Sequence, residues 1–373
     1  MSVLFVSPAK QPCGIHDYSR ALSAEIAGQG MDVRVAPPAQ SPAHLKNLFG
    51  VAAECDLVHV QFDPAHWQDL SHNWYFDFAK QIRKPLIVTL HEVYDENPFA
   101  YPYSGIRSAV PGMAWIKRWI YRKRHPGLAL ERKLRKNAYA ADALIVHNQH
   151  QKAILVRSGI KTEKIHVVPH GVWKAPTAPL RQEASVWRIG TFGFINPSSD
   201  FETVLQALSR LGLPWQYQIG GGPRITEHDI HMNQLLARIN DPALRNRVTV
   251  TGRIPEPDLD AFFLGLDLYI APFKFKSSSG SLHRAIAHGL PIIGPEIALI
   301  ADLNSRMPVV AAYKPGDPDS LALVIETILT SPGRRAESAT ASRRYAQAFS
   351  FEHEAKETVG LYRMMVDRGS RTM

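Results

Sequence analysis

Cysteine is nearly absent from the sequence, whose 373 residues include only Cys13 and Cys55. Two cysteines exclude a disulfide framework and a metal site built from cysteines, and they fit a reducing compartment. The sequence also has no run of eighteen apolar residues, so we expect no membrane-spanning helix. Its opening residues, MSVLFVSP, lead directly into a strand without a charged segment before an apolar one. This argues against a signal peptide and favours a cytoplasmic protein.

The glycine pattern of dinucleotide-binding proteins is missing from the first strand-helix-strand unit. A strand is expected at Val3–Val6, a helix up to Ala27 and a second strand ending at Val35. The loop after the first strand contains no Gly-x-Gly-x-x-Gly, the motif that holds a dinucleotide's pyrophosphate at a helix start. A dehydrogenase that uses NAD is therefore disfavoured.

The sequence has fewer acidic than basic residues, with 34 Asp and Glu and 43 Lys and Arg, and its formal net charge is +9. The excess is concentrated in Trp115–Tyr139, where nine basic residues and aromatic residues surround a single acid, Glu131. Such a segment is typical of a helix on an anionic membrane surface, and a solvated helix with inward-packed aromatics fits equally well. No recognition module accompanies it, so we expect no nucleic-acid partner.

What the sequence does contain is a globular composition and a regular alternation of strands and helices. Apolar residues make up 45% and charged residues 21%, and the length suits two domains, each with its own core. Pro176 and Pro179 mark a linker, after which the pattern restarts at Trp187. We therefore expect an α/β protein whose parts are an N-terminal domain at 1–172, a linker at 173–186, a C-terminal domain at 187–347 and a final segment at 348–373.

The most informative stretch is Val248–Pro295, which predicts three strands at 248–251, 268–272 and 291–294 and two helices at 257–265 and 282–288. Ser277–Ser281, SSSGS, opens the second helix directly after a buried strand. Small residues there leave backbone N–H groups accessible at the positive end of the helix, as a phosphate or diphosphate requires. The same residues also suit an ordinary helix cap.

Three motifs stand out in this stretch: Thr251-Gly252-Arg253-Ile254, Ala271-Pro272 and Ala285–Ile293, AIAHGLPII. They resemble motifs of glycosyltransferase family 4, a family of retaining enzymes with the GT-B fold. Two departures from the family pattern concern charge. Lys276 and Arg284 occupy the positions of the glutamates in the family's Glu-x7-Glu motif. Phe194 and Ser199 occupy those of the arginine and lysine that hold the donor diphosphate in the family.

The resemblance covers nearly the whole chain and implies a GT-B fold with two facing Rossmann-like domains. It assigns acceptor binding to the N-terminal domain at 1–172 and nucleotide-sugar binding to the C-terminal domain at 187–347. Phe349–Met365 resembles the family's closing helix, Phe-Ser-Trp-Glu with a later tyrosine. We therefore expect the segment at 348–373 to cross back to the first domain.

The resemblance also assigns candidate site residues. His91 follows a buried strand, like the family histidine that faces the transferred sugar, and is the expected catalytic residue; a histidine satisfied by local hydrogen bonds is the alternative. Trp67 and Trp74 are expected to stack on an acceptor sugar, although tryptophan more often packs within its own domain. The residues expected to bind the donor are Gly14, Gly193, Phe194, Gly221, Arg253, Ile254, Ser278, Ser279, Gly280, Ser281, Leu282 and Arg284.

Because the family's phosphate-binding cations are missing, we expect Arg284, Lys276 or Lys274 to supply part of the lost positive charge. The alternative is that these side chains only face solvent, which fits the two lysines somewhat better. Asp317-Pro318-Asp319 precedes a helix and is interpreted as a turn and N-cap rather than as a metal site.

The expected function is transfer of a hexosyl group from a nucleotide diphosphate sugar to a glycan or lipid-linked acceptor, with retention and without a cofactor or metal ion. We expect this polysaccharide-biosynthesis activity in the cytoplasm, with peripheral binding at the inner membrane face through 115–139. The alternative is a non-catalytic GT-B protein that binds sugar nucleotide or scaffolds a glycan-assembly complex. A GT-B epimerase is disfavoured, because the C-terminal half has few carboxylates for proton abstraction.

Overall fold

The computed structural model describes residues 1–9, 13–63, 66–67, 74–94, 140–181, 183–223 and 229–370. The chain divides into two compact units, of which the first contains Met1–Pro169 and Glu354–Met373 and the second contains His170–His353. The basic segment Trp115–Tyr139 lies outside the described residues. Its predicted contact with a membrane therefore stays a prediction.

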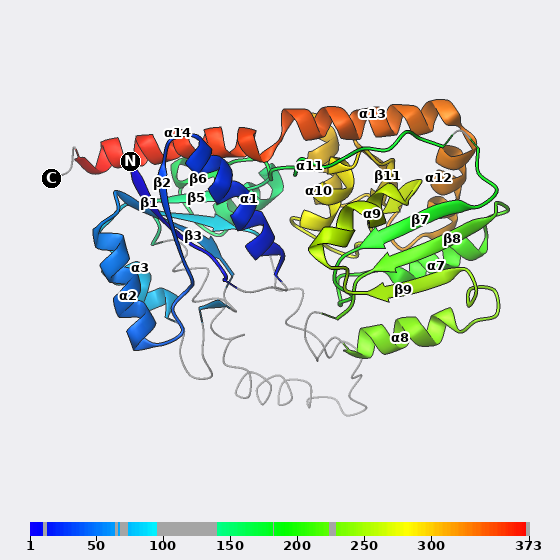
Figure 1. Cartoon of the computed structure of the whole chain (residues 1–373), viewed down its shortest axis with the longest axis horizontal. Coiled ribbons are helices and arrows are strands. Elements are labelled where there is room, and N and C mark those ends of the chain that lie inside the picture. The colour runs from blue at the N-terminus through cyan, green and yellow to red at the C-terminus, as the bar shows by residue number, and fades with distance from the viewer. Residues whose placement is uncertain are drawn as a thin grey trace. The chain divides into compact units, whose positions relative to one another are not determined.

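The first unit is built on a parallel six-stranded sheet with the order β2-β1-β3-β4-β5-β6. Its strands are β1 (Ser2–Val6), β2 (Asp32–Ala36), β3 (Leu57–Phe62), β4 (Leu86–Leu90), β5 (Ala143–Val146) and β6 (Ile165–Val167). Its helices include α1 (Gly14–Gly28), α2 (Pro42–Ala53), α3 (Tyr75–Gln81), α6 (Gln149–Arg157), the 3-10 turn at Thr162–Lys164 and most of α14 (Phe351–Ser370). Figure 1 shows the strands of this sheet in blue, cyan and green.

Strands β3 and β4 show why this sheet forms. All five residues of β4, LIVTL, are buried, as is typical of parallel strands that are covered on both faces. Strand β3, LVHVQF, is also buried throughout, but it carries the polar side chains of His59 and Gln61. Because a buried polar group is stable only when it is hydrogen-bonded, the core around β3 must supply partners for both.

The second unit contains another parallel six-stranded sheet, with the order β12-β11-β10-β7-β8-β9. Its strands are β7 (Trp187–Phe192), β8 (Trp215–Gly220), β9 (Val248–Gly252), β10 (Leu268–Ile270), β11 (Ile292–Pro295) and β12 (Val310–Tyr313). Its helices include α7 (Phe201–Ser209), α8 (Asp229–Ile239), α9 (Leu259–Leu264), α10 (Gly280–Ala287), α11 (Ala298–Arg306), α12 (Pro318–Thr330), α13 (Pro332–Ala348) and the 3-10 turn at Glu256–Asp258.

The order of elements predicted for Val248–Pro295 is confirmed, with shifts of a few residues at the ends. Strand β10 ends at Ile270, two residues earlier than expected, because Pro272 lacks the N–H group that a continued strand would use. Helix α10 begins at Gly280 because Ser279 is its N-cap and accepts a hydrogen bond from the N–H of Leu282 at 3.3 Å.

The expected role of Asp317 as a helix cap is also confirmed. Its carboxylate accepts hydrogen bonds from the N–H groups of Asp319 and Ser320, at 3.1 and 3.0 Å, at the start of α12. These bonds satisfy two N–H groups that have no partner within the helix.

The last helix, α14, returns the chain to the first unit as expected, because residues from Glu354 onward belong to that unit. Figure 1 shows α14 beside α1, and the hydroxyl of Tyr18 in α1 hydrogen-bonds to the carboxylate of Glu354. Both side chains are almost fully buried. The predicted architecture of two Rossmann-like domains and a returning C-terminal helix is therefore confirmed.

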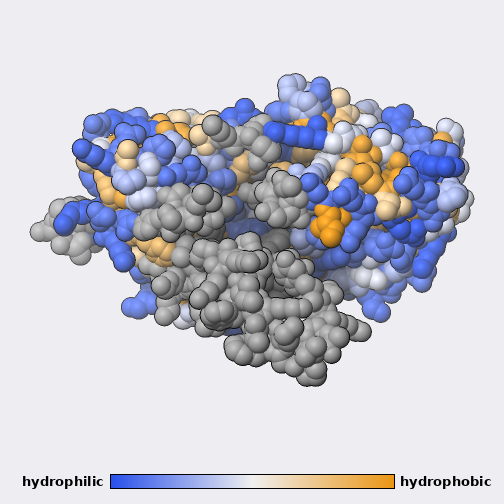
Figure 2. Space-filling view, turned by 90° about the horizontal axis from the view of Figure 1, so that it is seen from below, coloured by the Kyte–Doolittle hydropathy of each residue, from blue (hydrophilic) through white to orange (hydrophobic). Residues whose placement is uncertain are grey.

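The described surface is mostly polar. The exposed large apolar side chains include single residues such as Val35, Ile230 and Leu323, and Figure 2 shows one face on which apolar colour forms only small spots between hydrophilic areas. Within the described ranges, no helix has the length and apolar character that crossing a membrane requires.

We predict that Leu208→Ala destabilises the second unit by about 2–5 kcal/mol, because Leu208 in α7 is completely buried and its truncation leaves a cavity. Leu323→Ala is the control, since Leu323 in α12 is 65% exposed and its loss is expected to change stability by less than about 0.5 kcal/mol. Urea unfolding followed by circular dichroism measures both. Equal losses for the two variants would contradict this packing.

Candidate functional site

In each sheet the strand order reverses beside the first strand of the unit. In the second unit, β8 lies on one side of β7 and β10 lies on the other. The connections leave the carboxyl ends of these strands in opposite directions, and ligands of open α/β sheets bind in the space between them. Gly193 follows β7, Gly221 follows β8, Arg253 follows β9 and Ser278 follows β10. The residues expected to bind the donor in this unit therefore share one sheet edge.

The backbones of two glycine loops meet at this edge. The N–H of Gly193 donates to the carbonyl of Gly220 at 2.9 Å, and Gly221 forms an isolated bridge with Gly252. A Cβ atom on Gly221 would lie 1.8 Å from the carbonyl oxygen of Gly193, a distance that no side chain tolerates. Glycine at 221 is therefore required for the two loops to approach each other.

The start of α10 lies directly against the first of these loops. A Cβ atom on Gly193 would lie 3.4 Å from the hydroxyl oxygen of Ser281, which contacts the Ser279 hydroxyl at 3.0 Å. Within the described part of the chain, the backbone N–H groups of Gly280 and Ser281 form no hydrogen bond. Two N–H donors at the positive end of a helix are thus available to an anion beside Gly193.

Aromatic side chains hold the start of α10 in place. The imidazole of His283 stacks on that of His170, with ring centroids 4.2 Å apart, and its Nδ1 hydrogen-bonds to the carbonyl oxygen of Ser279 at 2.8 Å. Burial lowers the pKa of His283 to about 4, so the ring is neutral near pH 7 and Nδ1–H donates. Trp173 lies 3.6 Å from the Cβ position of Gly280. These contacts fix where the two open N–H groups point.

We expected Arg284 to supply positive charge to the donor phosphate, but the structure gives its side chain other partners. Its guanidinium forms an ion pair with Glu256, at 3.0 Å and 3.2 Å to the two carboxylate oxygens, and stacks on the ring of Trp173 at 4.4 Å. Only 11% of the Arg284 side chain is exposed. Its charge is therefore compensated by Glu256, and the expectation that Arg284 restores the lost phosphate-binding charge does not fit this arrangement.

The remaining donor candidates lie around this centre. Ser278 is buried, Leu282 is fully buried in the core beside α10, and Arg253 is exposed. Ile254 packs on the glycine loop, since its Cδ1 lies 2.6 Å from the Cβ position of Gly220. Phe194 is half-buried, and its carbonyl accepts a hydrogen bond from the Ser199 hydroxyl at 3.2 Å. Their contact with a donor remains a prediction.

The two lysines that we considered as substitutes for the family's cations both follow β10. Lys274 is exposed, and its backbone N–H bonds to the carbonyl of Ser198 at 2.8 Å, which ties it to the loop after β7. Lys276 is half-buried. Lys274 also lowers the pKa of His231, after the effect of burial. The backbone of Lys274 is thus tied to the loop that follows Gly193, and a contact of either ammonium group with a donor remains a prediction.

In the first unit, His91 follows β4 and is 8% exposed. Its Nε2 contacts the side-chain oxygen of Gln61 at 2.9 Å, and the edge of the Tyr18 ring packs against it, with centroids 4.7 Å apart. The side chain of Gln151 donates to the backbone carbonyl of His91 at 3.1 Å. Burial, with a smaller contribution from His59, lowers the pKa of His91 to about 3.

His91 is therefore a neutral imidazole whose Nε2 is hydrogen-bonded to Gln61. Its Nδ1 forms no hydrogen bond within the residues that the structure describes. A neutral imidazole carries no positive charge at physiological pH, but it can donate a hydrogen bond to a hydroxyl group or accept one from it. We considered the alternative that local hydrogen bonds satisfy His91. This is so for Nε2, whereas Nδ1 remains available to a ligand.

Of the other candidates in the first unit, Trp67 needs correction. Its side chain is completely buried and packs against Tyr75 and Phe78 in the core, so it has no surface to offer an acceptor sugar. Trp74 is half-buried, packs on the same core and remains an acceptor candidate. Gly14 is the exposed first residue of α1, with nothing among the described residues within 4 Å of its Cβ position.

The structure adds polar residues that sequence reasoning missed. Gln61 binds the His91 ring, His59 binds Gln61, and Tyr362 of α14 binds His59. Two of them left a signal in the sequence, because histidine and glutamine interrupt an otherwise apolar strand, LVHVQF. Nothing in the sequence placed Tyr362 beside them, since it lies 303 residues further along the chain than His59.

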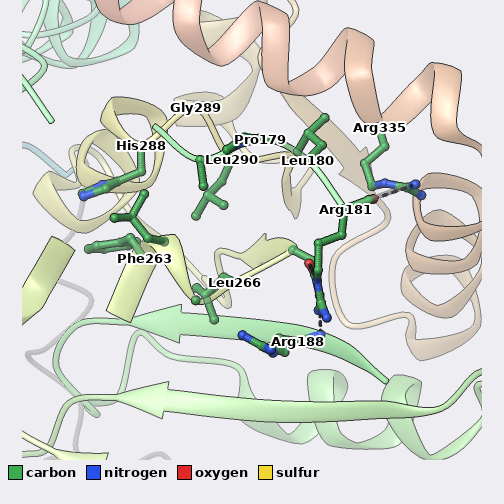
Figure 3. Close-up of a pocket in the computed structure, with 14 residues that line it drawn as sticks. Pro179, Leu180, Arg181, Arg188, Phe263, Leu266, His288, Gly289, Leu290 and Arg335 are labelled. Carbon is green, nitrogen blue, oxygen red and sulfur yellow. Dashed lines mark hydrogen bonds and ion pairs between the residues drawn. The ribbon is translucent and has the colours of Figure 1, made fainter. Parts of the chain in front are cut away.

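A cavity of about 70 Å³ lies elsewhere in the second unit (Figure 3). Its lining includes Arg188 near the start of β7, Asp267 just before β10 and Leu290 just before β11, so it lies at the amino ends of these strands. Arg181 pairs with Asp267 there, with 2.7 Å from Nε to Oδ1, and the buried Arg335 donates to backbone carbonyls including that of Arg181. These cations serve internal contacts at the edge opposite the glycine loops.

Comparison with protein families gives two matches that together cover most of the chain. Residues 31–173 match the model described as Glycosyltransferase Family 4, and residues 187–331 match Glycosyl transferases group 1. A curated relative, 2-deoxystreptamine glucosyltransferase from Streptomyces kanamyceticus, is 22% identical over 335 residues, which is 84% of this chain and 78% of that protein.

Solved structures are similar over nearly their whole length. Anabaena HepE in complex with UDP and glucose superimposes with a TM-score of 0.74 at 16% identity, covering 98% of this chain and 100% of HepE. WaaG, a glycosyltransferase involved in lipopolysaccharide biosynthesis, gives a TM-score of 0.65 at 14% identity, covering 97% and 99%. These likenesses confirm the expected GT-B fold.

We predict that Gly221→Ala destabilises the second unit by about 1–3 kcal/mol, because the new methyl group overlaps the carbonyl oxygen of Gly193 and forces the two loops apart. Gly222→Ala is the matched control, since nothing among the described residues lies within 4 Å of its Cβ position. Thermal unfolding of both variants measures the difference. Equal melting temperatures would contradict the close contact between the loops.

Proposed function

The chain belongs to glycosyltransferase family 4, and we propose that it transfers a hexosyl group from a nucleoside diphosphate sugar to a glycan or lipid-linked acceptor with retention of configuration. The observation that carries this proposal is the pair of unbonded N–H groups at the start of α10, beside the loop of Gly193. A diphosphate is the ligand chemistry that such an edge of a parallel sheet favours.

UDP-glucose is the donor that we propose first. HepE has been solved with UDP-glucose as well as with UDP and glucose, and the curated relative is a glucosyltransferase. A uridine diphosphate leaving group suits the N–H donors of Gly280 and Ser281, because negative charge increases on the phosphate as the sugar leaves. A well-aimed donor at such a position can lower a reaction barrier by roughly 3 kcal/mol.

His91 is proposed to face the transferred sugar, as the corresponding histidine does in the family. Its neutral imidazole would form a hydrogen bond through Nδ1 with a hydroxyl group of the substrate and so keep the sugar oriented. The proposed reaction needs no protein nucleophile, since the departing phosphate can assist attack on the same face of the sugar. No metal ion enters this proposal, because the helix N–H groups stabilise the leaving phosphate.

Glu256 is proposed to supply a carboxylate that the family's motif positions lack here. Arg284 holds it beside the Arg253-Ile254 loop through a two-point ion pair. In the family, a glutamate of the Glu-x7-Glu motif binds hydroxyl groups of the nucleotide ribose. We propose that Glu256 takes this role, so that Arg284 acts as its positioning residue and does not contact phosphate.

The alternative function is a non-catalytic protein that binds sugar nucleotide within a glycan-assembly complex. The substitutions at four family positions favour it, since Phe194 and Ser199 replace two cations and Lys276 and Arg284 replace two carboxylates by residues of opposite charge. Both functions include nucleotide binding. They differ in whether UDP-glucose is consumed, either by transfer or by slow hydrolysis.

The acceptor and the cellular site remain parts of the proposal. WaaG acts in lipopolysaccharide biosynthesis, which supports a glycan or lipid-linked acceptor. The basic segment Trp115–Tyr139 supports peripheral binding to an anionic membrane surface, where a lipid-linked acceptor would be found.

The donor class is tested by thermal shift with UDP, GDP, ADP, CMP and dTDP, and we expect UDP alone to raise the melting temperature clearly. The N–H site is then tested with Gly280→Pro and Gly280→Ala. Proline is accepted at the first helical position but lacks the N–H, whereas alanine keeps it. A Cβ atom fits at this position, because the nearest atoms to it are 3.6 and 4.0 Å away.

We predict that Gly280→Pro binds UDP about 10- to 100-fold more weakly than Gly280→Ala, because a hydrogen bond to a charged group contributes about 1.5–3 kcal/mol. Isothermal titration calorimetry gives both dissociation constants. The proposed phosphate site is wrong if the two variants bind UDP equally well.

We predict that His91→Ala lowers the rate of UDP-glucose consumption by at least about tenfold while UDP affinity stays unchanged, since His91 is proposed to bind the sugar and not the nucleotide. His44→Ala is the control, because His44 lies on the exposed face of α2. Binding of UDP without any consumption of UDP-glucose by the wild-type protein, with glycan acceptors present, would favour the non-catalytic alternative.

A further inference from the structure

The side chain of Gln151 links two backbone segments in the core of the first unit. Strands β4 and β5 run side by side in parallel, and His91 and His147 are the residues that directly follow them. The backbone N–H of His147 donates to Oε1 of Gln151 at 2.7 Å, and Nε2 of Gln151 donates to the backbone carbonyl of His91 at 3.1 Å. A side-chain amide therefore joins the two segments just beyond the strand ends.

The orientation of this amide is fixed by its two partners. A backbone carbonyl only accepts hydrogen bonds, and a backbone N–H only donates one. The oxygen of Gln151 must therefore face His147 and its nitrogen must face His91, because turning the amide over would break both bonds. Gln151 is completely buried, so bulk water does not replace either partner.

The first turn of α6 places Gln151 between the two segments. Asn148 is the N-cap of α6, and its side-chain oxygen accepts a hydrogen bond from the backbone N–H of Gln151 at 2.8 Å. Because α6 begins at Gln149, soon after β5 ends at Val146, the turn between them also sets the position of the Gln151 amide.

Side chains hold the His91 ring from other directions. Gln61 contacts its Nε2 at 2.9 Å, and Tyr18 packs against it with centroids 4.7 Å apart. The ring of His147 lies beside it, with centroids 5.4 Å apart. Gln151 adds a different constraint, because it holds the peptide group from which the His91 side chain extends. With both backbone and ring held, the direction of the open Nδ1 is defined.

We propose that Gln151 is a positioning residue, which aligns Nδ1 of His91 with its ligand by holding the His91 backbone carbonyl. The inference rests on the proposed function, in which this Nδ1 forms a hydrogen bond with a hydroxyl group of the transferred sugar. Without the amide, the His91 carbonyl and the His147 N–H lose a buried partner, and the two segments shift to find others. A displacement of about 1 Å at a reacting site can lower a rate about 100-fold.

The test is a double-mutant cycle between Gln151 and His91, with kcat for UDP-glucose consumption measured in the full-length protein. Gln151→Met replaces the amide by an apolar side chain of similar length and removes both hydrogen bonds. We expect it to lower kcat at least about tenfold. UDP affinity should stay unchanged, because the proposed phosphate site belongs to the second unit. Gln149→Met is the control and should keep the wild-type kcat, since Gln149 is an exposed residue of the same helix.

The second half of the cycle asks whether Gln151 acts through His91. In the His91→Ala background, we expect Gln151→Met to change kcat by less than about twofold, because no imidazole is left to position. If the two substitutions instead lower kcat by independent factors that multiply, Gln151 only supports the fold and the proposal is overturned. An unchanged kcat for Gln151→Met alone overturns it as well.

Circular dichroism shows whether Gln151→Met folds. If it does not, Gln151→Asn takes its place in the cycle, with the same expected results. Asparagine keeps the amide but is one methylene shorter, so it cannot keep both hydrogen-bond distances at once.

A readout that needs no activity separates this inference from the proposed function. In protein labelled with ¹⁵N-histidine, His91→Gln identifies the ring signals of His91 among those of the 16 histidines. We expect Gln151→Met to shift these signals and Gln149→Met to leave them as in the wild type. Unshifted signals in Gln151→Met would overturn the positioning role. Shifted signals, with a wild-type protein that binds UDP but consumes no UDP-glucose, would refute the proposed function and leave the placement of His91 by Gln151 standing.

Discussion

The contact between the backbones of Gly193 and Gly221 is the constraint on which the candidate donor site depends. It brings the loops after β7 and β8 together at the point where the strand order reverses, and only glycine at 221 permits it. The start of α10 lies against the same loop through Ser281. Any side chain at 221 would push the loops apart and change the distance between Gly193 and the two open N–H groups. Backbone geometry, more than charged side chains, therefore defines this site.

If the proposed donor site is correct, this reliance on backbone would compensate for the charged residues of the family that the site lacks. A side-chain cation holds phosphate through a flexible stem, whereas helix N–H groups are already oriented and lose little entropy on binding. The exchange of glutamate for Arg284 has a local compensation in Glu256, whose carboxylate lies within 3.2 Å of the guanidinium. The ion pair and the stacking on Trp173 use the charge of Arg284 inside the unit. A substitution at the motif position has thus been accommodated by a residue from the loop after β9.

In the first unit, polar residues occupy core positions at which apolar side chains would pack well. His59 and Gln61 stand in a strand whose neighbours in sequence are all buried and apolar. Each would be costly without partners; His59 contacts Tyr362, Thr89 and Gln61, and Gln61 also contacts His91. Removing one member of this network leaves its buried neighbour without a partner, which costs stability. The network makes the returning helix α14 a part of the core around His91 and not only a cover for it.

The sequence by itself determined the fold class, the order of elements in Val248–Pro295, the helix cap at Asp317 and the position of His91 after β4, because these follow from local periodicity, capping and motif order. It also indicated the glycine loops and the serines of α10. Only the tertiary structure decided which side chains meet. Trp67 proved to be a core residue, Arg284 proved to be paired with Glu256, and Tyr362 was found beside His59 across 303 positions of sequence. Burial and ion pairing between distant segments depend on how helices pack on the sheets, and no local pattern contains that information.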